Sequence, residues 1–130
     1  MSSDSDRYEI IVEVLAELEE MSWDRVILVE GRRDVTALEH LGIFGDVFTV
    51  QSSGGPIKAA EYVYKKKKKA VILTDWDRKG DIIASDLEIQ LSALDIQYDI
   101  DIRDRLAGLC RIDIKDVQSL DELVNRLSIA

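Results

Sequence analysis

Three acidic residues stand directly after apolar runs, where their type and spacing could support chemistry. Glu30 follows the run from Val26 to Val29, and Asp75 and Asp77 follow the run from Ala70 to Thr74. Side chains alternate along a strand with a period of two, so an extended segment would carry both aspartates on one side. If the two runs are neighbouring strands, as in a flavodoxin-like order, the glutamate would face the aspartate pair.

Carboxylates gathered in this way repel one another and require a proton or a cation. Two unit charges about 4 Å apart interact by about 4 kcal/mol at an effective dielectric constant of about 20. Hard oxygen ligands at an open edge suit Mg²⁺, which completes its shell with waters and phosphate oxygens. Asp34, one helical turn beyond Glu30, could reach the same ion. The sequence therefore predicts a Mg²⁺ site, in which Mn²⁺ could substitute, made by Glu30, Asp34, Asp75 and Asp77. It leaves open whether one or two ions bind.

A glycine and several cations flank these acids. Gly80 permits a close approach of the backbone to a ligand. Arg32 and Arg78 could neutralise a phosphodiester and its transition-state charge, and they are equally well explained as solvated loop charges. For Arg33 and Lys79 the solvated explanation is favoured.

Alternating strand and helix patterns would position these residues. Apolar runs predict strands at residues 26–29, 47–50, 70–74 and 97–102. Helical spacing predicts helices at 7–20, 34–41, 57–64 and 80–94, and a helical turn or short helix at 103–109. A Ser119–Glu122 capping box predicts the start of a last helix. We therefore expect an α/β fold of three layers, with a four-stranded, mostly parallel central sheet and an extra N-terminal helix. In such sheets ligands bind beyond the carboxyl ends of the strands.

Other residues have both a functional and a structural interpretation. Ser53 and Gly54 follow the second strand and could line a substrate groove or form an ordinary loop. Trp76 could stack on a base, although packing against a helix is favoured. The run Lys65–Lys69 precedes the third strand, so it starts at the edge opposite the acids, which favours a solvated helix end. A long RNA or a partner could still use it. Trp23 is expected to tether the first helix to the sheet.

The composition limits the function classes. The chain has 130 residues, enough for one domain, and a net charge of −9 from 17 basic and 26 acidic residues. This balance argues against a protein that simply coats DNA. No apolar run is long enough to span a membrane, and the single cysteine cannot form an internal disulfide, so we expect a cytoplasmic protein.

Three other motif families do not fit the segment that begins at Asp75. An EF-hand loop would need a glutamate where Asp86 stands, and a helix rather than a strand would precede it. A haloacid-dehalogenase phosphatase would have a threonine at Lys79. A receiver domain would have an acidic pair after its first strand, where this chain has Glu30 followed by Gly31.

Two segments carry a family resemblance: VEGRRDVTAL and ILTDWDRKGDIIA resemble the signature segments of the Toprim domain. Topoisomerases of types IA and II, bacterial-type primases, OLD-family nucleases and the bacterial 5S rRNA maturation ribonuclease share this domain. The resemblance covers roughly residues 25–110 and is closest in wording to small stand-alone Toprim proteins of archaea. It implies Mg²⁺-dependent nucleotidyl transfer or phosphodiester cleavage, with Glu30 as general acid or base and Asp75 and Asp77 as metal ligands. The chain has no room for the tyrosine-bearing domain of topoisomerases or the zinc-binding domain of primases.

On this basis we expect an acidic segment with an amphipathic helix at residues 1–24 and a Toprim domain with a C-terminal helix at 25–130. The expected function is that of a small nuclease acting on RNA or DNA, with Arg32, Arg78, Ser53 and Gly54 binding the substrate. The alternative is a non-catalytic or partner-dependent module that binds structured nucleic acid or a ribonucleoprotein, and a third interpretation is synthesis of a small nucleotide product. We expect that a homodimer or a protein partner supplies further contacts with the substrate. No membrane association is expected.

Overall fold

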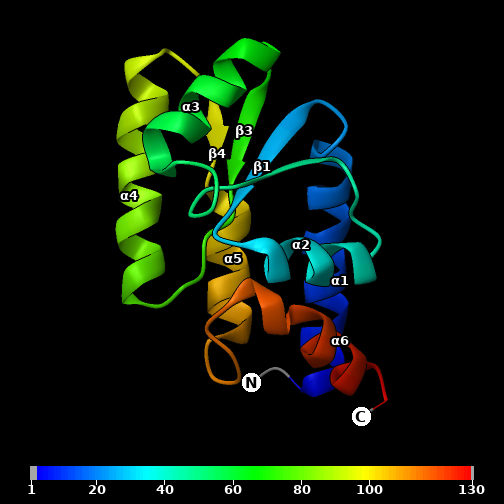
Figure 1. The fold of residues 1–130 in the computed structure, drawn as a ribbon. Coiled ribbons are helices and arrows are strands. Elements are labelled where there is room, and N and C mark those ends of the chain that lie inside the picture. The colour runs from blue at the N-terminus through cyan, green and yellow to red at the C-terminus, as the bar shows by residue number, and fades with distance from the viewer. Residues whose placement is uncertain (1–2, 130) are drawn as a thin grey trace.

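The structure is a computed structural model that describes residues 3–129, and it has a four-stranded parallel sheet at its centre (Figure 1). The strand order is β2-β1-β3-β4, and every neighbouring pair is parallel. The strands are β1 (Arg25–Val29), β2 (Asp46–Thr49), β3 (Lys69–Ile72) and β4 (Tyr98–Asp99). The helices are α1 (Asp4–Met21), α2 (Arg32–His40), α3 (Gly55–Lys66), α4 (Arg78–Ala93), α5 (Asp101–Cys110) and α6 (Leu120–Ser128), with a 3₁₀ helix η1 (Val117–Ser119) before α6.

Helices cover both faces of the sheet, which confirms the expected three-layer α/β fold. Alternate residues of a strand point to opposite faces. One face, with Ile27 and Val71, packs against α1, α2, α5 and α6. The other face, with Leu28 and Ile72, packs against α3 and α4. The central strands are therefore buried on both sides, as continuous apolar runs require.

Helix α1 contributes directly to the core. Its buried side chains Ile11, Val14, Leu15 and Leu18 recur at helical spacing and join the cluster that contains Ile27 and Val71. Within residues 3–129, no helix combines the length and the apolar character needed to cross a membrane.

The fourth strand is shorter than the sequence pattern predicts, and this prediction of residues 97–102 is wrong at its end. The carboxylate of Asp99 accepts a hydrogen bond from the N–H of Ile102 at 3.0 Å, so the chain turns into α5 instead of continuing the strand. The apolar pattern continues past Asp99 because Ile102, in the first turn of α5, also packs into the core. Local periodicity therefore does not distinguish a longer strand from a strand that is followed by a helix.

Two further expectations are corrected. Ser119 makes no side-chain capping bond, and Asp116 accepts from the Ser119 N–H at 3.0 Å, which begins η1 one turn earlier. Trp23 does not tether α1 to the sheet, because 78% of its surface is exposed. The buried stripe of α1 performs that function without it.

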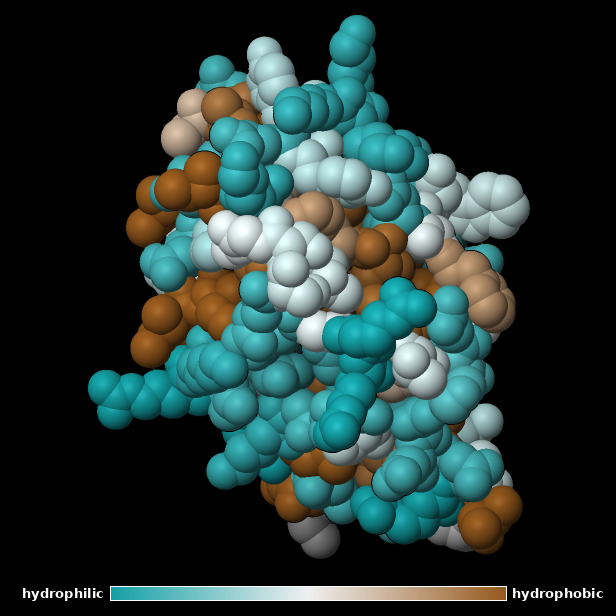
Figure 2. Space-filling model, in the orientation of Figure 1, coloured by the Kyte–Doolittle hydropathy of each residue, from teal (hydrophilic) through white to brown (hydrophobic). Residues whose placement is uncertain are grey.

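Hydrophobic side chains also reach the surface over α3 and α4, at the left edge of the space-filling view (Figure 2). Exposed isoleucines of these two helices include Ile57, Ile82 and Ile89. Most of the remaining visible face is hydrophilic.

Candidate metal centre

Glu30 and Asp75 meet because β1 and β3 are parallel neighbours that end at the same edge of the sheet. The pairing of Leu28 with Ile72 continues in a hydrogen bond from the N–H of Leu73 to the carbonyl of Leu28 at 2.8 Å. Two residues further on, the N–H of Asp75 donates to Glu30 Oε2, also at 2.8 Å. Glu30 is only 6% exposed. The expected adjacency of the first and third strands is confirmed, and it places these two residues in contact.

Asp75 is held in an environment that disfavours its negative charge. The pKa of Asp75 is raised to about 7, chiefly by burial, with smaller contributions from the charges of Glu30 and Asp116 and a lowering by the N–H of Val117. That N–H donates to Asp75 Oδ1 at 2.9 Å. The fold therefore concentrates negative charge here that a cation would stabilise.

Asp34 belongs to the same acidic group. It lies in the first turn of α2, and its Oδ2 accepts from the N–H of Gly31 at 3.0 Å. Burial raises the pKa of Asp34 to about 6, with smaller contributions from the charges of Asp75 and Asp116. The structure thus brings Asp34 within electrostatic range of Asp75, as the spacing from Glu30 suggested.

Asp77 is the N-cap of α4. Its Oδ1 accepts from the N–H of Gly80 at 2.7 Å, which satisfies one of the free donors at the start of that helix. As the side chains stand, residues 3–129 hold no group of three His, Cys, Asp or Glu that is arranged to bind a metal ion. Asp75 and Asp77 each have a second carboxylate oxygen outside these backbone bonds. This set of hard oxygen donors fits the chemistry of Mg²⁺.

Gly80 is required where the loop after β3 turns into α4. A Cβ at this position would lie 1.8 Å from the backbone oxygen of Asp75, so no other residue fits without movement of the loop. The hydroxyl of Thr74 donates to the carbonyl of Gly80 at 2.8 Å and closes the same turn. Glycine at position 80 thus allows the backbone at the start of α4 to lie against the backbone of Asp75.

Arg103 is a residue of the site that sequence reasoning missed. It is only 6% exposed, and its Nε donates to the carbonyl of Thr74 at 3.0 Å. Its Nη2 donates to the carbonyl of Asp75 and to Asp81 Oδ1, both at 2.6 Å. Arg103 therefore fixes the backbone that carries Asp75. The sequence offers one indication of this function: Arg103 follows Ile102 on the buried side of a predicted helical segment.

Asp116 was missed as well. It lies in the connection between α5 and α6 and raises the pKa values of Asp34 and Asp75. Nothing in the sequence near Asp116 links it to residues 41 or more positions away, so only the tertiary fold reveals it.

Four cations border the acids on the exposed surface. Arg32, Arg33, Arg78 and Lys79 are all exposed. Among residues 3–129, none of these four cations lies within 4.0 Å of a carboxylate, since all the salt bridges there are made by other cations. These side chains are therefore available to an anionic ligand.

The loop after β2 lies beside Glu30. The N–H of Gln51 donates to the carbonyl of Glu30 at 3.1 Å. Ser53 is exposed in this loop, with its hydroxyl 3.2 Å from that of Thr49. Gly54 has a φ of 107° and is the N-cap of α3, so it adopts the left-handed region that favours glycine. Ser53 and Gly54, two of the four residues predicted to bind substrate, thus lie at the same edge as the acids.

Trp76 has a structural function. It is 3% exposed, and its indole N–H donates to the carbonyl of Ile114 at 2.8 Å. Packing, rather than stacking on a base, explains this residue.

A parallel α/β sheet with a glutamate after one central strand and a D-x-D pair after its neighbour defines the Toprim class of domain. The family model described as Toprim domain matches residues 25–103. The chain belongs to the Toprim family.

Two relatives from archaea are similar to nearly the whole chain. A UPF0292 protein of Methanosarcina barkeri is 38% identical over 124 residues, which cover 95% of this chain and 86% of the relative. A UPF0292 protein of Methanocaldococcus jannaschii is 32% identical over 119 residues, covering 92% and 93% of the two chains. A solved structure of a protein from Aquifex aeolicus has a TM-score of 0.69 and 28% identity, and the match covers 82% of this chain and 94% of that one. These findings confirm the resemblance to small stand-alone Toprim proteins.

Proposed function

We propose that this protein is a Mg²⁺-dependent phosphodiesterase that cleaves RNA or DNA. The observation that carries the proposal is the contact between Glu30 and Asp75, in which the partly buried Asp75 has a pKa raised to about 7. The Toprim domain indicates a metal-binding function related to nucleic acids. Perturbed carboxyl groups at the ends of neighbouring strands support a catalytic site at this edge.

Asp75, Asp77 and Asp34 would hold the ion, with Glu30 at its side. When bound, Mg²⁺ supplies polarisation of the phosphoryl group and activation of water. Mn²⁺ offers the same preference for oxygen ligands.

Side chains of this protein would transfer the proton and bind the substrate. Glu30 Oε2 is occupied by the Asp75 N–H, whereas Oε1 has only a 3.5 Å contact with the Gln51 amide. Oε1 is therefore the atom that would accept a proton from the attacking water and return it to the leaving oxygen. Arg32 and Arg78 would bind the phosphodiester oxygens, and Ser53 and Gly54 would line the path of the strand.

The test is cleavage of structured RNA, single-stranded DNA and double-stranded DNA in Mg²⁺, in Mn²⁺ and in EDTA. Wild type is compared with Glu30→Gln, with Asp75→Asn and with a matched control, Asp86→Asn, which changes an exposed aspartate of α4. We expect metal-dependent cleavage that falls by roughly 10²-fold or more in the first two variants and persists in the control. No cleavage, or equal cleavage by all four proteins, would refute the proposal.

A second candidate function is a partner-dependent or non-catalytic module that binds structured nucleic acid or a ribonucleoprotein. It is supported by the structural bonds that the acids already make, since Asp77 caps α4 and Asp75 holds the N–H of Val117. The fold therefore has a use for these aspartates without catalysis. Binding in the same panel without cleavage would favour this function and direct a search for a homodimer or a protein partner.

A further inference from the structure

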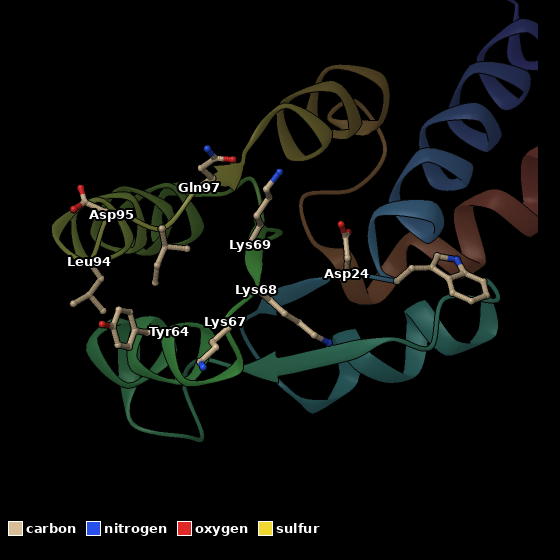
Figure 3. A pocket seen from close by; sticks show the side chains of 10 residues that line it. Asp24, Tyr64, Lys67, Lys68, Lys69, Leu94, Asp95 and Gln97 are labelled. Atoms are coloured by element: carbon tan, nitrogen blue, oxygen red, sulfur yellow. The ribbon is translucent and has the colours of Figure 1, made fainter.

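A concentration of lysines lies at the end of the sheet opposite the metal centre. The turns that lead into β1, β3 and β4 lie together at the upper end of the molecule (Figure 1). Lys65–Lys69 connect α3 to β3 there, and together with Tyr64 they are called the lysine surface below. It borders a hollow of about 820 Å³ lined by Trp23, Asp24, Tyr64, Lys67, Lys68, Lys69, Leu94, Asp95, Ile96 and Gln97 (Figure 3).

Three of these lysines have no acidic partner in the part of the chain that the structure describes. Lys66 and Lys68 lie 3.7 and 3.9 Å from Asp46. Lys65, Lys67 and Lys69 are exposed, and residues 3–129 place no carboxylate within 4.0 Å of them. These three positive charges are therefore available to an anionic ligand.

The lysine side chains spread apart instead of converging. Figure 3 shows Lys67, Lys68 and Lys69 pointing in three different directions. A single small anion would need donors that converge on one point. A spread of charges suits a polymer whose negative charges are themselves spaced along a chain.

The backbone does not account for lysine at position 67. Lys67 is the C-cap of α3 with a φ of 55°, in the left-handed region where glycine or asparagine is preferred. Cations in the last turn of a helix favour its dipole, which explains Lys65 and Lys66. Lys67 and Lys69 lie beyond that turn, so the helix dipole does not explain them.

Two exposed aromatic rings line the same hollow. Tyr64 is 59% exposed and Trp23 is 78% exposed. Proteins that bind single strands combine a cationic path with aromatic faces on which bases stack. Asp24 and Asp95 also line the hollow and would repel a polyanion, so the attraction between the lysines and the phosphates must exceed this repulsion.

We propose that the lysine surface binds single-stranded nucleic acid, with phosphates against Lys65, Lys67 and Lys69 and bases stacked on Tyr64 and Trp23. The proposal extends the proposed function, since it takes the same class of polymer. The lysine surface is separate from the metal centre. Lys69 lies about 20 Å from Asp75, since the chain between them rises by roughly 3.3 Å per residue along β3 and beyond it. The surface would bind a long substrate at a second place, in addition to the cations beside the metal centre.

The first test measures binding of a labelled single-stranded oligonucleotide of about 20 nucleotides, a length above the site size of small single-strand binders. EDTA is present, so that cleavage does not contribute. We expect the triple variant K65Q/K67G/K69Q to bind at least about tenfold more weakly. The salt dependence should fall by about 2 in slope, since each neutralised phosphate contributes roughly 0.7 for a single strand. Arg126→Gln, which removes one exposed cation from α6, is the control and should bind like wild type.

Lys67→Gly separates binding from folding. Glycine relieves the left-handed conformation, so the variant should melt at a higher temperature while it binds the oligonucleotide several-fold more weakly. If lysine had only a structural function, the variant would keep its affinity, and this result would overturn the proposal.

Tryptophan fluorescence tests the stacking. Trp76 is buried, so quenching by the oligonucleotide should come from Trp23 and disappear in Trp23→Phe. Absence of quenching in wild type, or equal competition by polyglutamate, would overturn binding of nucleic acid in favour of an acidic protein. Wild type that binds the oligonucleotide through these lysines but cleaves nothing would refute the proposed function alone. Wild type that cleaves, with a triple variant K65Q/K67G/K69Q that binds as tightly as wild type, would refute the lysine surface alone.

Discussion

At the scale of single residues, Asp75 makes stability depend on pH. Its pKa rises from 3.8 to about 7 on folding, so the fold favours the protonated form. This contribution to stability is complete below about pH 4 and is lost as the pH rises through about 7. We expect the free energy of unfolding of the metal-free protein to fall by about 2–3 kcal/mol between pH 5 and 8 because of this residue.

Asp75→Asn should abolish that loss and leave the protein more stable than wild type at pH 8 in EDTA. Urea unfolding at both pH values, with Asp86→Asn as the control, measures it. An unchanged pH dependence in Asp75→Asn would show that the carboxyl group titrates normally.

Gly80 gives a prediction from geometry alone. Gly80→Ala places a methyl group against the backbone of Asp75, where a Cβ would be 1.8 Å from the oxygen, and should cost about 3 kcal/mol or more. Gly108→Ala, in α5 with open space around its Cβ position, should stabilise by about 0.5–1 kcal/mol. Thermal unfolding of the two variants checks both signs, and equal effects would contradict the contact.

At the scale of elements, α5 holds the end of β3 through Arg103. Arg103→Met leaves the carbonyls of Thr74 and Asp75 without their buried donor and should cost about 2–4 kcal/mol. Arg105→Met, on the same helix, loses an exposed pair with Glu17 and should have a much smaller effect. Chemical unfolding measures the loss of stability in the two variants. Similar losses would mean that the buried hydrogen bonds of Arg103 contribute no more than the exposed ion pair of Arg105.

At the scale of the whole molecule, α1 and the Toprim domain share one core. The family match begins at residue 25, yet Leu18 of α1 is fully buried in the same cluster as Val71 of β3. Leu18→Ala should destabilise the protein by about 2–5 kcal/mol and preserve a single cooperative transition. Separate transitions for α1 and the rest, followed by hydrogen exchange, would show that α1 unfolds independently of the core.

The sequence by itself determined the class of fold and the position of the acids. Apolar runs and helical spacing located the main elements, because local periodicity reports which side of an element is buried. Glu30, Asp75 and Asp77 could be selected because they directly follow two such runs. Their assignment as metal ligands stays a prediction.

Only the tertiary structure decided which groups meet. Asp75 reaches Glu30 across 45 residues of sequence, Val117 across 42, and Arg103 across 28. Such contacts depend on which strands pair and where each helix packs back, and no local window of sequence contains that information. The exposure of Trp23 was missed for the same reason, whereas the early end of β4 was missed because a local bond between Asp99 and Ile102 starts a helix where the apolar pattern continues. Hydrophobicity alone predicts burial, but the space that the neighbouring elements leave decides whether a side chain obtains it.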